Sequence, residues 1–284
     1  MTSRTPSDPR GAQPQPAYDT AMQSPPGSTE AMSPRPDHGE KSYQGTGKLT
    51  NRSVLITGGD SGIGRAVAIA FAREGADVAI THLPQERQDA EETGKLVKDA
   101  GVRAVLIETD LTEEENCRAV IDRVIDEFER IDILVNNAAY QMSVDGIEKL
   151  TDEQLDRVMK TNVYAMVWLC RAAVRHMPQG SSIINTSSIQ AYEPSPNLLD
   201  YAMTKAAIAN FTKSLSLDLI QRGIRVNSVA PGPVWTPLIP ATNTPMGRPA
   251  QPAELAPIYG FLASEESRYI TGDVLGVTGG RPIS

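Results

Sequence analysis

Cysteine and histidine are scarce in this sequence of 284 residues, which has two cysteines and three histidines. Cys117 and Cys170 lie in separate helical patterns, with no CxxC motif or Cys/His cluster around them. We therefore expect neither a disulfide framework nor a zinc site. His38, His82 and His176 are scattered along the chain and predict no metal site either. This cysteine usage fits a reducing cytoplasm.

The sequence also lacks an excess of basic residues and any long hydrophobic segment. Its formal net charge is −8 and its pI is about 5.0, which argues against nucleic acid or an anionic membrane surface as the main partner. The longest apolar helical stretch, Val163 to Cys170, is followed by Arg171 and is far too short to span a bilayer. The N-terminal residues contain no apolar signal-peptide core. These features predict a cytoplasmic protein that acts on a small molecule.

Residues 1–48 differ in composition from the rest of the chain. They contain eight prolines among glycine, serine, glutamine and charged residues, a composition that cannot bury enough apolar surface to fold alone. Such a segment is either a disordered tail or a stiff, extended arm. We predict an arm that lies against its own or a partner subunit and stabilises the assembly without supplying catalytic groups. Its apolar anchors would be Tyr18, Met22, Met32 and Tyr43.

Residues 49–284 show alternating strand and helix patterns. Short apolar runs rich in β-forming residues occur at 53–57, 77–81, 103–108, 132–136, 181–187, 225–230 and 274–278. Helical periods fall between them, at 62–74, 86–100, 113–129, 151–177 with a break, 201–222 and 252–263. Strands that are apolar on both faces indicate a parallel sheet covered by helices on both sides. We predict a single α/β domain with a Rossmann-type doubly wound parallel seven-stranded sheet and a ligand crevice at the carboxyl ends of the strands.

The first predicted strand leads into a glycine-rich segment, "TGGDSGIGRA". Gly58, Gly62 and Gly64 would let the chain turn tightly, bring backbone N–H groups against a pyrophosphate, and place the next helix close to the sheet. The spacing is Gly-x-x-x-Gly-x-Gly rather than the commoner Gly-x-Gly-x-x-Gly. A glycine-rich turn without a ligand is the alternative. The strand before it and the helix after it favour dinucleotide binding.

Tyr201 and Lys205 lie four residues apart, so a helix places them on one face. They would form either a solvated surface pair or a catalytic pair. A cation beside a phenol stabilises the phenolate and lowers its pKa from about 10. Such a tyrosine becomes a general acid or base, and the other motifs must decide between the two readings.

These motifs resemble those of the short-chain dehydrogenase/reductase family in its compact single-domain form, over roughly residues 49–284. Thr57 to Gly64 resembles the family's cofactor loop, and Asp110 in "TDLT" resembles the acid that holds the adenine ring. The segment "NNAA" is close to the family's Asn-Asn-Ala-Gly, with Ala139 in place of the last glycine. "PGPVWT" resembles the segment that closes over the nicotinamide, where Thr236 would reach the carboxamide.

The resemblance implies a catalytic set of Asn162, Ser188, Tyr201 and Lys205. In this family the catalytic serine precedes the tyrosine by thirteen residues, which is the separation between Ser188 and Tyr201. Neighbouring strand residues point to opposite faces, so Ser187 is expected to be structural.

The resemblance also implies a role for each member of this set. Tyr201 would give a proton to a carbonyl or take one from an alcohol, and Lys205 would lower its pKa, helped by the positive nicotinamide, and bind the nicotinamide ribose. Ser188 would hydrogen-bond the substrate oxygen. Asn162 would hold a water that links Lys205 to solvent, and the cofactor would supply the hydride.

Larger sets of residues are implied for the cofactor and the substrate. The cofactor set is Gly58, Asp60, Ser61, Gly62, Ile63, Gly64, Asp110, Leu111, Asn137, Ala138, Tyr201, Lys205, Pro231, Gly232, Val234 and Thr236. The substrate set is Ser188, Gln190, Tyr192, Tyr201 and Trp235, with Gln141 and the segment after Thr236 nearby. That segment is shorter than in relatives, which predicts an open pocket unless residues are absent from the printed sequence.

The cofactor is expected to be NADP rather than NAD. NAD-selective enzymes carry an acid at the end of the second strand, and residues 80–85 contain none. Arg65 and Arg87 are the candidates for holding a 2′-phosphate.

We therefore predict an NAD(P)-dependent oxidoreductase that interconverts a small aldehyde, ketone or sugar-like carbonyl compound and its alcohol. The Pro-rich extension with "SSIQAYEPSP" and "QPAELAP" resembles a bacterial branch described as aldehyde reductases or glucose/ribitol-type dehydrogenases. A dehydratase or epimerase that uses bound cofactor, or a non-catalytic cofactor-sensing regulator, remains an alternative. Members of this form assemble as tetramers, so the resemblance implies a homotetramer through 151–177, 201–222 and the last strand with its preceding helix.

Overall fold

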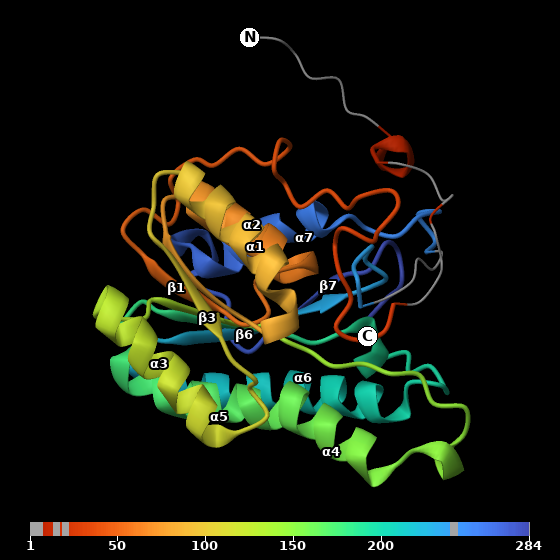
Figure 1. Ribbon diagram of the computed structural model, residues 1–284. Coiled ribbons are helices and arrows are strands. Elements are labelled where there is room, and N and C mark those ends of the chain that lie inside the picture. The colour runs from red at the N-terminus through yellow and green to blue at the C-terminus, as the bar shows by residue number, and fades with distance from the viewer. Residues whose placement is uncertain (1–7, 14–17, 19–22, 239–243, 284) are drawn as a thin grey trace.

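The computed structural model describes residues 8–13, 18, 23–238 and 244–283. It contains a seven-stranded sheet in which every pair of neighbours is parallel, with the strand order β3-β2-β1-β4-β5-β6-β7 (Figure 1). The strands are β1 (Ser53–Ile56), β2 (Asp77–His82), β3 (Ala104–Glu108), β4 (Ile133–Asn136), β5 (Ser182–Thr186), β6 (Arg225–Pro231) and β7 (Val274–Val277). The order reverses between β1 and β4, which is where this type of sheet binds its ligand. The predicted doubly wound sheet is confirmed.

Helices cover both faces of the sheet, as Figure 1 shows. One layer contains α1 (Gly62–Arg73), α2 (Arg87–Asp99) and α7 (Pro252–Ala263). The other contains α3 (Glu114–Phe128), α4 (Asp152–Met159), α5 (Ala165–Ala173) and α6 (Leu199–Leu219). The predicted helical periods are confirmed, with ends that differ by a few residues.

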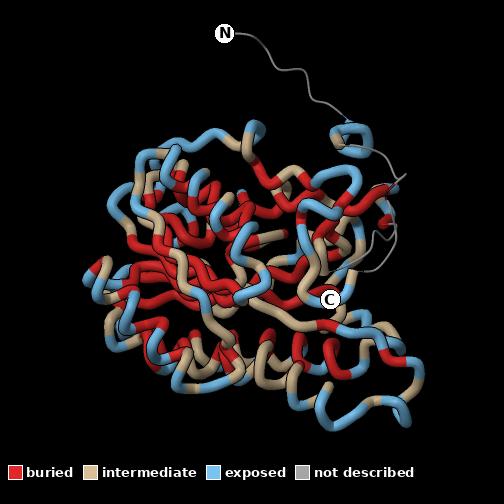
Figure 2. The backbone as a smooth tube through the Cα atoms, viewed as in Figure 1, coloured by how far each residue is buried: buried red, intermediate tan, exposed pale blue. Residues whose placement is uncertain are grey.

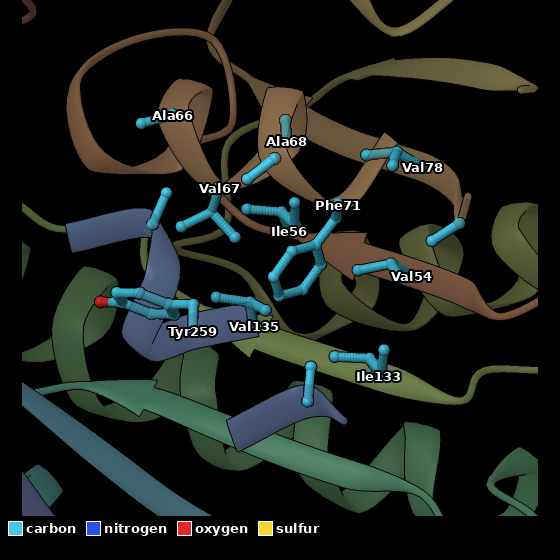
Figure 3. Close-up of a cluster of buried hydrophobic side chains, with 14 of the residues drawn as sticks. Val54, Ile56, Ala66, Val67, Ala68, Phe71, Val78, Ile133, Val135 and Tyr259 are labelled. Atoms are coloured by element: carbon cyan, nitrogen blue, oxygen red, sulfur yellow. The ribbon is translucent and has the colours of Figure 1, made fainter. Parts of the chain in front are cut away.

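The sheet has a hydrophobic core on each face. Successive residues of a strand point to opposite sides, so Val54 and Ile56 pack with Phe71 under α1 and α7, whereas Leu55 packs with Leu134 on the other side. Figure 3 shows the first of these clusters. Figure 2 shows the buried strands lying between two layers whose outer surfaces are exposed. The continuous apolar runs in the sequence reflect this burial on both faces.

The break expected within residues 151–177 lies between α4 and α5. Residues Lys160–Tyr164 form a π-helical turn, which is wider than an α-helical turn. The chain then continues as α5. Asn162 therefore lies on an irregular turn rather than in a regular helix.

Residues 1–48 are called the N-terminal arm. The described part of this arm lies against the layer of α1, α2 and α7 of the same chain (Figure 1). At the end of α1, the Arg73 guanidinium donates to the carbonyl oxygens of Gly39, Glu40 and Tyr43 at 2.8, 2.6 and 2.5 Å. The Tyr43 hydroxyl donates to Glu74 at 2.7 Å. The Pro-rich segment thus obtains from the folded domain the contacts that it cannot make alone.

A small apolar cluster holds another part of the arm. Tyr18 and Met32 are buried against Trp235, with the Tyr18 and Trp235 ring centroids 4.7 Å apart. The Trp235 indole N–H donates to the Pro34 carbonyl at 2.7 Å. Tyr18 and Met32 are anchors as predicted, and Met22 lies outside the described residues.

Candidate active site

A cavity of about 410 Å³ lies at the carboxyl ends of the parallel strands. Residues within two positions of the strand ends supply much of its lining: Gly58 after β1, Thr109 after β3, Asn137 after β4, Ser187 after β5 and Gly232 after β6. Most of the predicted cofactor residues line it: Gly58, Asp60, Ser61, Gly62, Ile63, Asp110, Leu111, Asn137, Ala138, Tyr201, Lys205, Pro231, Gly232, Val234 and Thr236. The predicted crevice is therefore present at the expected edge of the sheet.

The glycine-rich loop is too closely packed for side chains. A Cβ atom at Gly64 would lie 1.9 Å from the Gly58 carbonyl oxygen, and a Cβ atom at Gly58 would lie 3.1 Å from the Ala138 Cα. Gly58 also has a φ of +60°, which glycine adopts readily. The loop leads directly into α1, whose first N–H groups have no partners within the helix. These residues fit a dinucleotide, because the pyrophosphate would meet backbone N–H groups at a helix N-terminus.

Thr57 and Asn137 join the glycine loop to the end of β4. The backbone N–H groups of Asn137 and Ala138 donate to the Thr57 hydroxyl at 2.9 and 3.0 Å. The Asn137 amide donates to the carbonyl oxygens of Thr57 and Gly58 at 3.1 and 3.0 Å. Asn137 therefore positions the loop. Ala139, where the family pattern has glycine, also lines the cavity and has an ordinary negative φ.

Tyr201 and Lys205 are buried on α6 and both line the cavity. The Lys205 Nζ lies 5.3 Å from the centre of the Tyr201 ring and donates to the Thr186 carbonyl oxygen at 2.9 Å. The exposed fractions of the two residues are 5% and 2%. A solvated surface pair is therefore ruled out, and the side chains face the same space as the glycine loop.

Burial controls the proton affinities of this pair. It raises the pKa of Tyr201 to about 12, against the opposing effect of a hydrogen bond with Ser188, and it lowers the pKa of Lys205 to about 7. Removal from water disfavours the charged form of both groups, so the net pKa of Tyr201 is raised. The expected lowering by Lys205 together with the positive nicotinamide concerns the cofactor complex and stays a prediction. Tyr201 keeps its proton at neutral pH, which suits a proton donor.

The two adjacent serines have different partners. Ser188 lines the cavity and its hydroxyl accepts from the Gln190 N–H at 3.1 Å. The Ser187 hydroxyl donates to the Lys205 carbonyl oxygen at 2.7 Å and so joins the end of β5 to α6. This arrangement agrees with a structural role for Ser187.

Asn162 is fixed by three hydrogen bonds from the π-helical turn. Its side-chain oxygen accepts from the Tyr140 N–H at 2.7 Å, and its nitrogen donates to the Tyr140 carbonyl and the Thr204 hydroxyl, each at 3.0 Å. It lines a small neighbouring space of about 10 Å³ instead of the main cavity. Thr204 in turn donates to the Tyr201 carbonyl at 2.7 Å, so Asn162 is linked to the helix turn that holds Tyr201.

Asp110 lines the cavity beside a cation that the sequence interpretation missed. Burial would raise its pKa, but hydrogen bonds from Arg157, at 2.8 Å, and from the Thr112 N–H hold the pKa below its ordinary value. Arg157 comes from α4 and also lines the cavity. It lies 47 residues from Asp110 and forms no short motif with it, so only the fold brings the two together.

Two carboxyl groups face the cavity near the end of β2. Burial, with the charge of Asp60, raises the pKa of Glu86 to about 7, and burial raises the pKa of Asp60 to about 6. One Glu86 oxygen accepts from the Leu83 N–H at 2.8 Å. Within the described residues, the Asp60 Oδ2 has no hydrogen-bond partner. Glu86 directly follows residues 80–85, the segment in which an acid was expected for an NAD-selective enzyme.

The arginines expected to hold a 2′-phosphate are engaged elsewhere. Arg65 pairs with Glu92 at 3.1 Å, and Arg87 pairs with Glu108 at 2.6 Å. Neither belongs to the described residues that line the cavity. The structure thus gives no support to that part of the sequence interpretation.

Comparison with known proteins supports one family throughout. A family model described as enoyl-(acyl carrier protein) reductase matches residues 58–281. The uncharacterized oxidoreductase YhxD of Bacillus subtilis (strain 168) is 50% identical over 92% of this chain and 93% of its own length. The NADPH-dependent aldehyde reductase 1, chloroplastic, of Arabidopsis thaliana is 46% identical over 91% and 96%.

A solved structure gives the same answer. A short-chain dehydrogenase from Burkholderia cenocepacia J2315 in complex with NADP has a TM-score of 0.79 and 33% identity, and the match covers 82% of this chain and 98% of that one. The chain belongs to the short-chain dehydrogenase/reductase family. It is therefore a member of an oxidoreductase family, as predicted.

Part of the substrate set predicted for this short-chain dehydrogenase/reductase lies away from the cavity. Among the described lining residues are Ser188, Tyr201 and Gln141, but not Gln190, Tyr192 or Trp235. The Gln190 amide is engaged with Ser195. Trp235 packs under the arm, so the prediction that it contacts substrate is not supported by its position.

Other residues enter the cavity without having been predicted. Tyr140 and Met142, which follow the "NNAA" segment, line it. So do residues Gln23 to Gly27 of the arm. Residues 239–243 of the segment after Thr236 lie outside the described residues, so the expected openness of the pocket on that side is untested.

The described part of the chain contains neither a candidate membrane span nor a candidate metal cluster. No helix there is long and apolar enough to cross a membrane. No group of three or more His, Cys, Asp and Glu side chains there is arranged to hold a metal ion.

Proposed function

We propose that this protein is an NAD(P)-dependent oxidoreductase that interconverts a small aldehyde, ketone or sugar-like carbonyl compound and the corresponding alcohol. The observation that carries the proposal is that Ser188, Tyr201 and Lys205 line the same cavity as the glycine-rich loop. Dinucleotide-binding and acid-base groups therefore face one space. The name of the Arabidopsis relative supports carbonyl reduction.

The cofactor in this proposal is NADP or NAD. Backbone N–H groups of residues 58–64 would bind the pyrophosphate, and Asp110 and Leu111 would lie at the adenine. Thr236 would hold the nicotinamide end. NADP is favoured by the Arabidopsis relative and the Burkholderia complex. Bound there, the nicotinamide would supply or accept the hydride.

Tyr201 would move the proton in this reaction. Because burial keeps its pKa at about 12, the phenol is protonated at neutral pH and would donate to the carbonyl oxygen in reduction. Ser188, which shares a hydrogen bond with Tyr201, would stabilise the charge that develops on that oxygen. In oxidation the same hydroxyl must lose its proton, so the reverse direction would be favoured at higher pH.

Lys205 and Asn162 would support this proton transfer. Lys205 has a pKa near 7, so it carries a charge below neutral pH and would then stabilise negative charge on the Tyr201 oxygen. Above neutral pH it would still donate hydrogen bonds to the cofactor ribose. Asn162 would position α6 through Thr204, and we retain the proposal that it also holds a water next to Lys205.

Replacing Tyr201 by phenylalanine tests this function. Tyr201→Phe should lower kcat by at least about a hundredfold, the usual scale for a lost general acid, with cofactor affinity unchanged. Lys205→Ala should impair both turnover and cofactor binding. Turnover is followed by the absorbance of reduced nicotinamide against product formed, with a panel of aldehydes, ketones and sugars.

Tyr269→Phe is the matched control, because Tyr269 is fully exposed and does not line the cavity. Near-normal turnover by Tyr201→Phe would refute the assignment. Product formation without a stoichiometric change in nicotinamide absorbance would instead favour a dehydratase or epimerase. Cofactor binding with no turnover of any substrate would favour a regulator.

A further inference from the structure

A closed turn of the N-terminal arm forms one wall of the cavity. The Gln23 side chain donates to the Ser28 carbonyl at 3.0 Å and accepts from the Ser28 N–H at 2.7 Å. These two bonds join the ends of the segment from Gln23 to Ser28, which we call the arm turn. Its residues from Gln23 to Gly27 line the cavity together with the glycine loop. The arm turn thus has a defined shape and faces the proposed cofactor site.

The arm turn is held on one side by the start of α2. The Thr29 N–H, directly after the turn, donates to the Asp89 carboxylate at 3.0 Å, and Thr29 is completely buried. Asp89 lies in the first turn of α2, close in sequence to Glu86, which also lines the cavity. This contact therefore places the arm turn next to the end of β2.

The arm turn is held on its other side by the segment after β6. A Cβ atom at Gly27 would lie 2.8 Å from the Pro237 Cβ and 2.9 Å from the Pro237 carbonyl oxygen. Pro237 follows Thr236, which is proposed to hold the nicotinamide end. Farther along the arm, the Trp235 indole bonds to Pro34. The arm turn therefore spans the cavity between the segments that follow β2 and β6.

We propose that the arm turn is part of the cofactor site and contacts the bound dinucleotide, so that docking of the arm and binding of NADP or NAD strengthen each other. The proposal rests on the proposed function. The glycine loop, the end of β2, Pro237 and the arm turn all contribute residues to the lining of one cavity. Because coupling between two binding events is reciprocal, a ligand that contacts the arm turn must also stabilise its docked position.

Substituting Gly27 tests the proposal in the full-length protein. Gly27 has an ordinary negative φ, so Gly27→Val acts through its side chain, which would push the arm turn away from Pro237. We expect the Kd values of NADPH and NADH, measured by nicotinamide fluorescence titration, to rise by about five- to tenfold, a typical coupling strength. Gly11→Ala is the matched control in the same arm, because a Cβ at Gly11 meets nothing within 4 Å.

A second variant and a second measurement cover the case in which Gly27→Val does not fold. Gln23→Ala removes both bonds that close the arm turn and should weaken binding in the same direction. In the wild type, hydrogen exchange should show that added NADPH slows exchange of the Thr29 and neighbouring arm amides as well as those of the glycine loop.

Two results overturn the proposal. In the first, both variants bind NADPH and NADH like the wild type while cofactor protects the glycine loop but not the arm. This would leave the proposed function intact. In the second, the wild type itself binds neither cofactor, which would remove the proposed function together with this inference.

Discussion

Glu86 lines the cavity and bears on the choice between NAD and NADP, but the sequence interpretation did not include it. It lies near the end of β2, where folds of this type place the acid that binds the ribose of NAD. Its carboxylate would repel a 2′-phosphate. At pH 8 or above, where this carboxyl is ionised, Glu86→Gln should therefore raise the ratio of kcat/KM for NADPH to that for NADH by roughly tenfold, which corresponds to about one pKa unit of interaction. Glu91→Gln, an exposed change on α2, should leave the ratio unchanged.

Ionisation of the Glu86 carboxyl should make the preference between NADPH and NADH depend on pH. The pKa of Glu86 is raised to about 7, so the carboxyl is neutral below this pH and the repulsion of NADPH disappears. The NADPH to NADH ratio of the wild type should rise as the pH falls through 7. The groups that influence Glu86 are Asp60, His82 and Asp89. If the NADPH to NADH ratio of Glu86→Gln still changes with pH, with an inflection near pH 6, the effect belongs to Asp60 instead. If the wild-type ratio does not change with pH, neither Glu86 nor Asp60 controls cofactor preference.

Single residues show where sequence reasoning succeeded and where it failed. Tyr201 and Lys205 face one cavity because their spacing places them on one face of α6, and Ser188 faces it from the segment that follows β5. Arg157 was missed because its position beside Asp110 depends on packing between elements distant in sequence. Glu86 was missed because it lies one residue beyond the segment 80–85 in which an acid was expected. The sequence reveals the cation beside Tyr201 but not the loss of water that raises the pKa of this phenol.

At the scale of elements, Arg73 at the end of α1 is one of the polar attachments of the arm. It donates to three arm carbonyls. Arg73→Met should lower the free energy of unfolding by about 1–3 kcal/mol, because partly buried carbonyls lose their donor. Arg123→Met on α3 is the control, since its exposed pair with Glu127 contributes about 0–1 kcal/mol. Equal urea midpoints for the two variants would contradict the anchoring role.

The periodic elements were predictable, but the course of the arm was not. The strands and helices repeat the two- and 3.6-residue periods that burial imposes, and even the irregular turn before α5 was indicated as a break. The arm has no such period. Its path depends on single acceptors and donors such as Arg73 and Asp89, whose partners cannot be identified from composition.

At the scale of the whole molecule, assembly can be tested through exposed apolar side chains. Several lie on or near the segments expected to form a tetramer: Tyr164, Met203, Leu217, Ile220 and Tyr269. The double change Met203→Glu and Leu217→Glu should shift the sedimentation coefficient to smaller species by placing charges in an apolar contact. Ile147→Glu, exposed but outside those helices, should not. A wild type that sediments as a monomer would exclude the tetramer.

The contacts of the arm also determine when it can dock fully during synthesis of the chain. Arm residues leave the ribosome first, and partners such as Arg73 and Asp89 follow soon after, but other partners are made near the end of the chain: Trp235 for Pro34, and Gln251 and Ala253 for Asp37. Complete docking must therefore wait for most of the polypeptide. If the arm turn contributes to cofactor binding, a nascent chain acquires the finished site only after most of the catalytic domain has folded, and truncated translation products lack it.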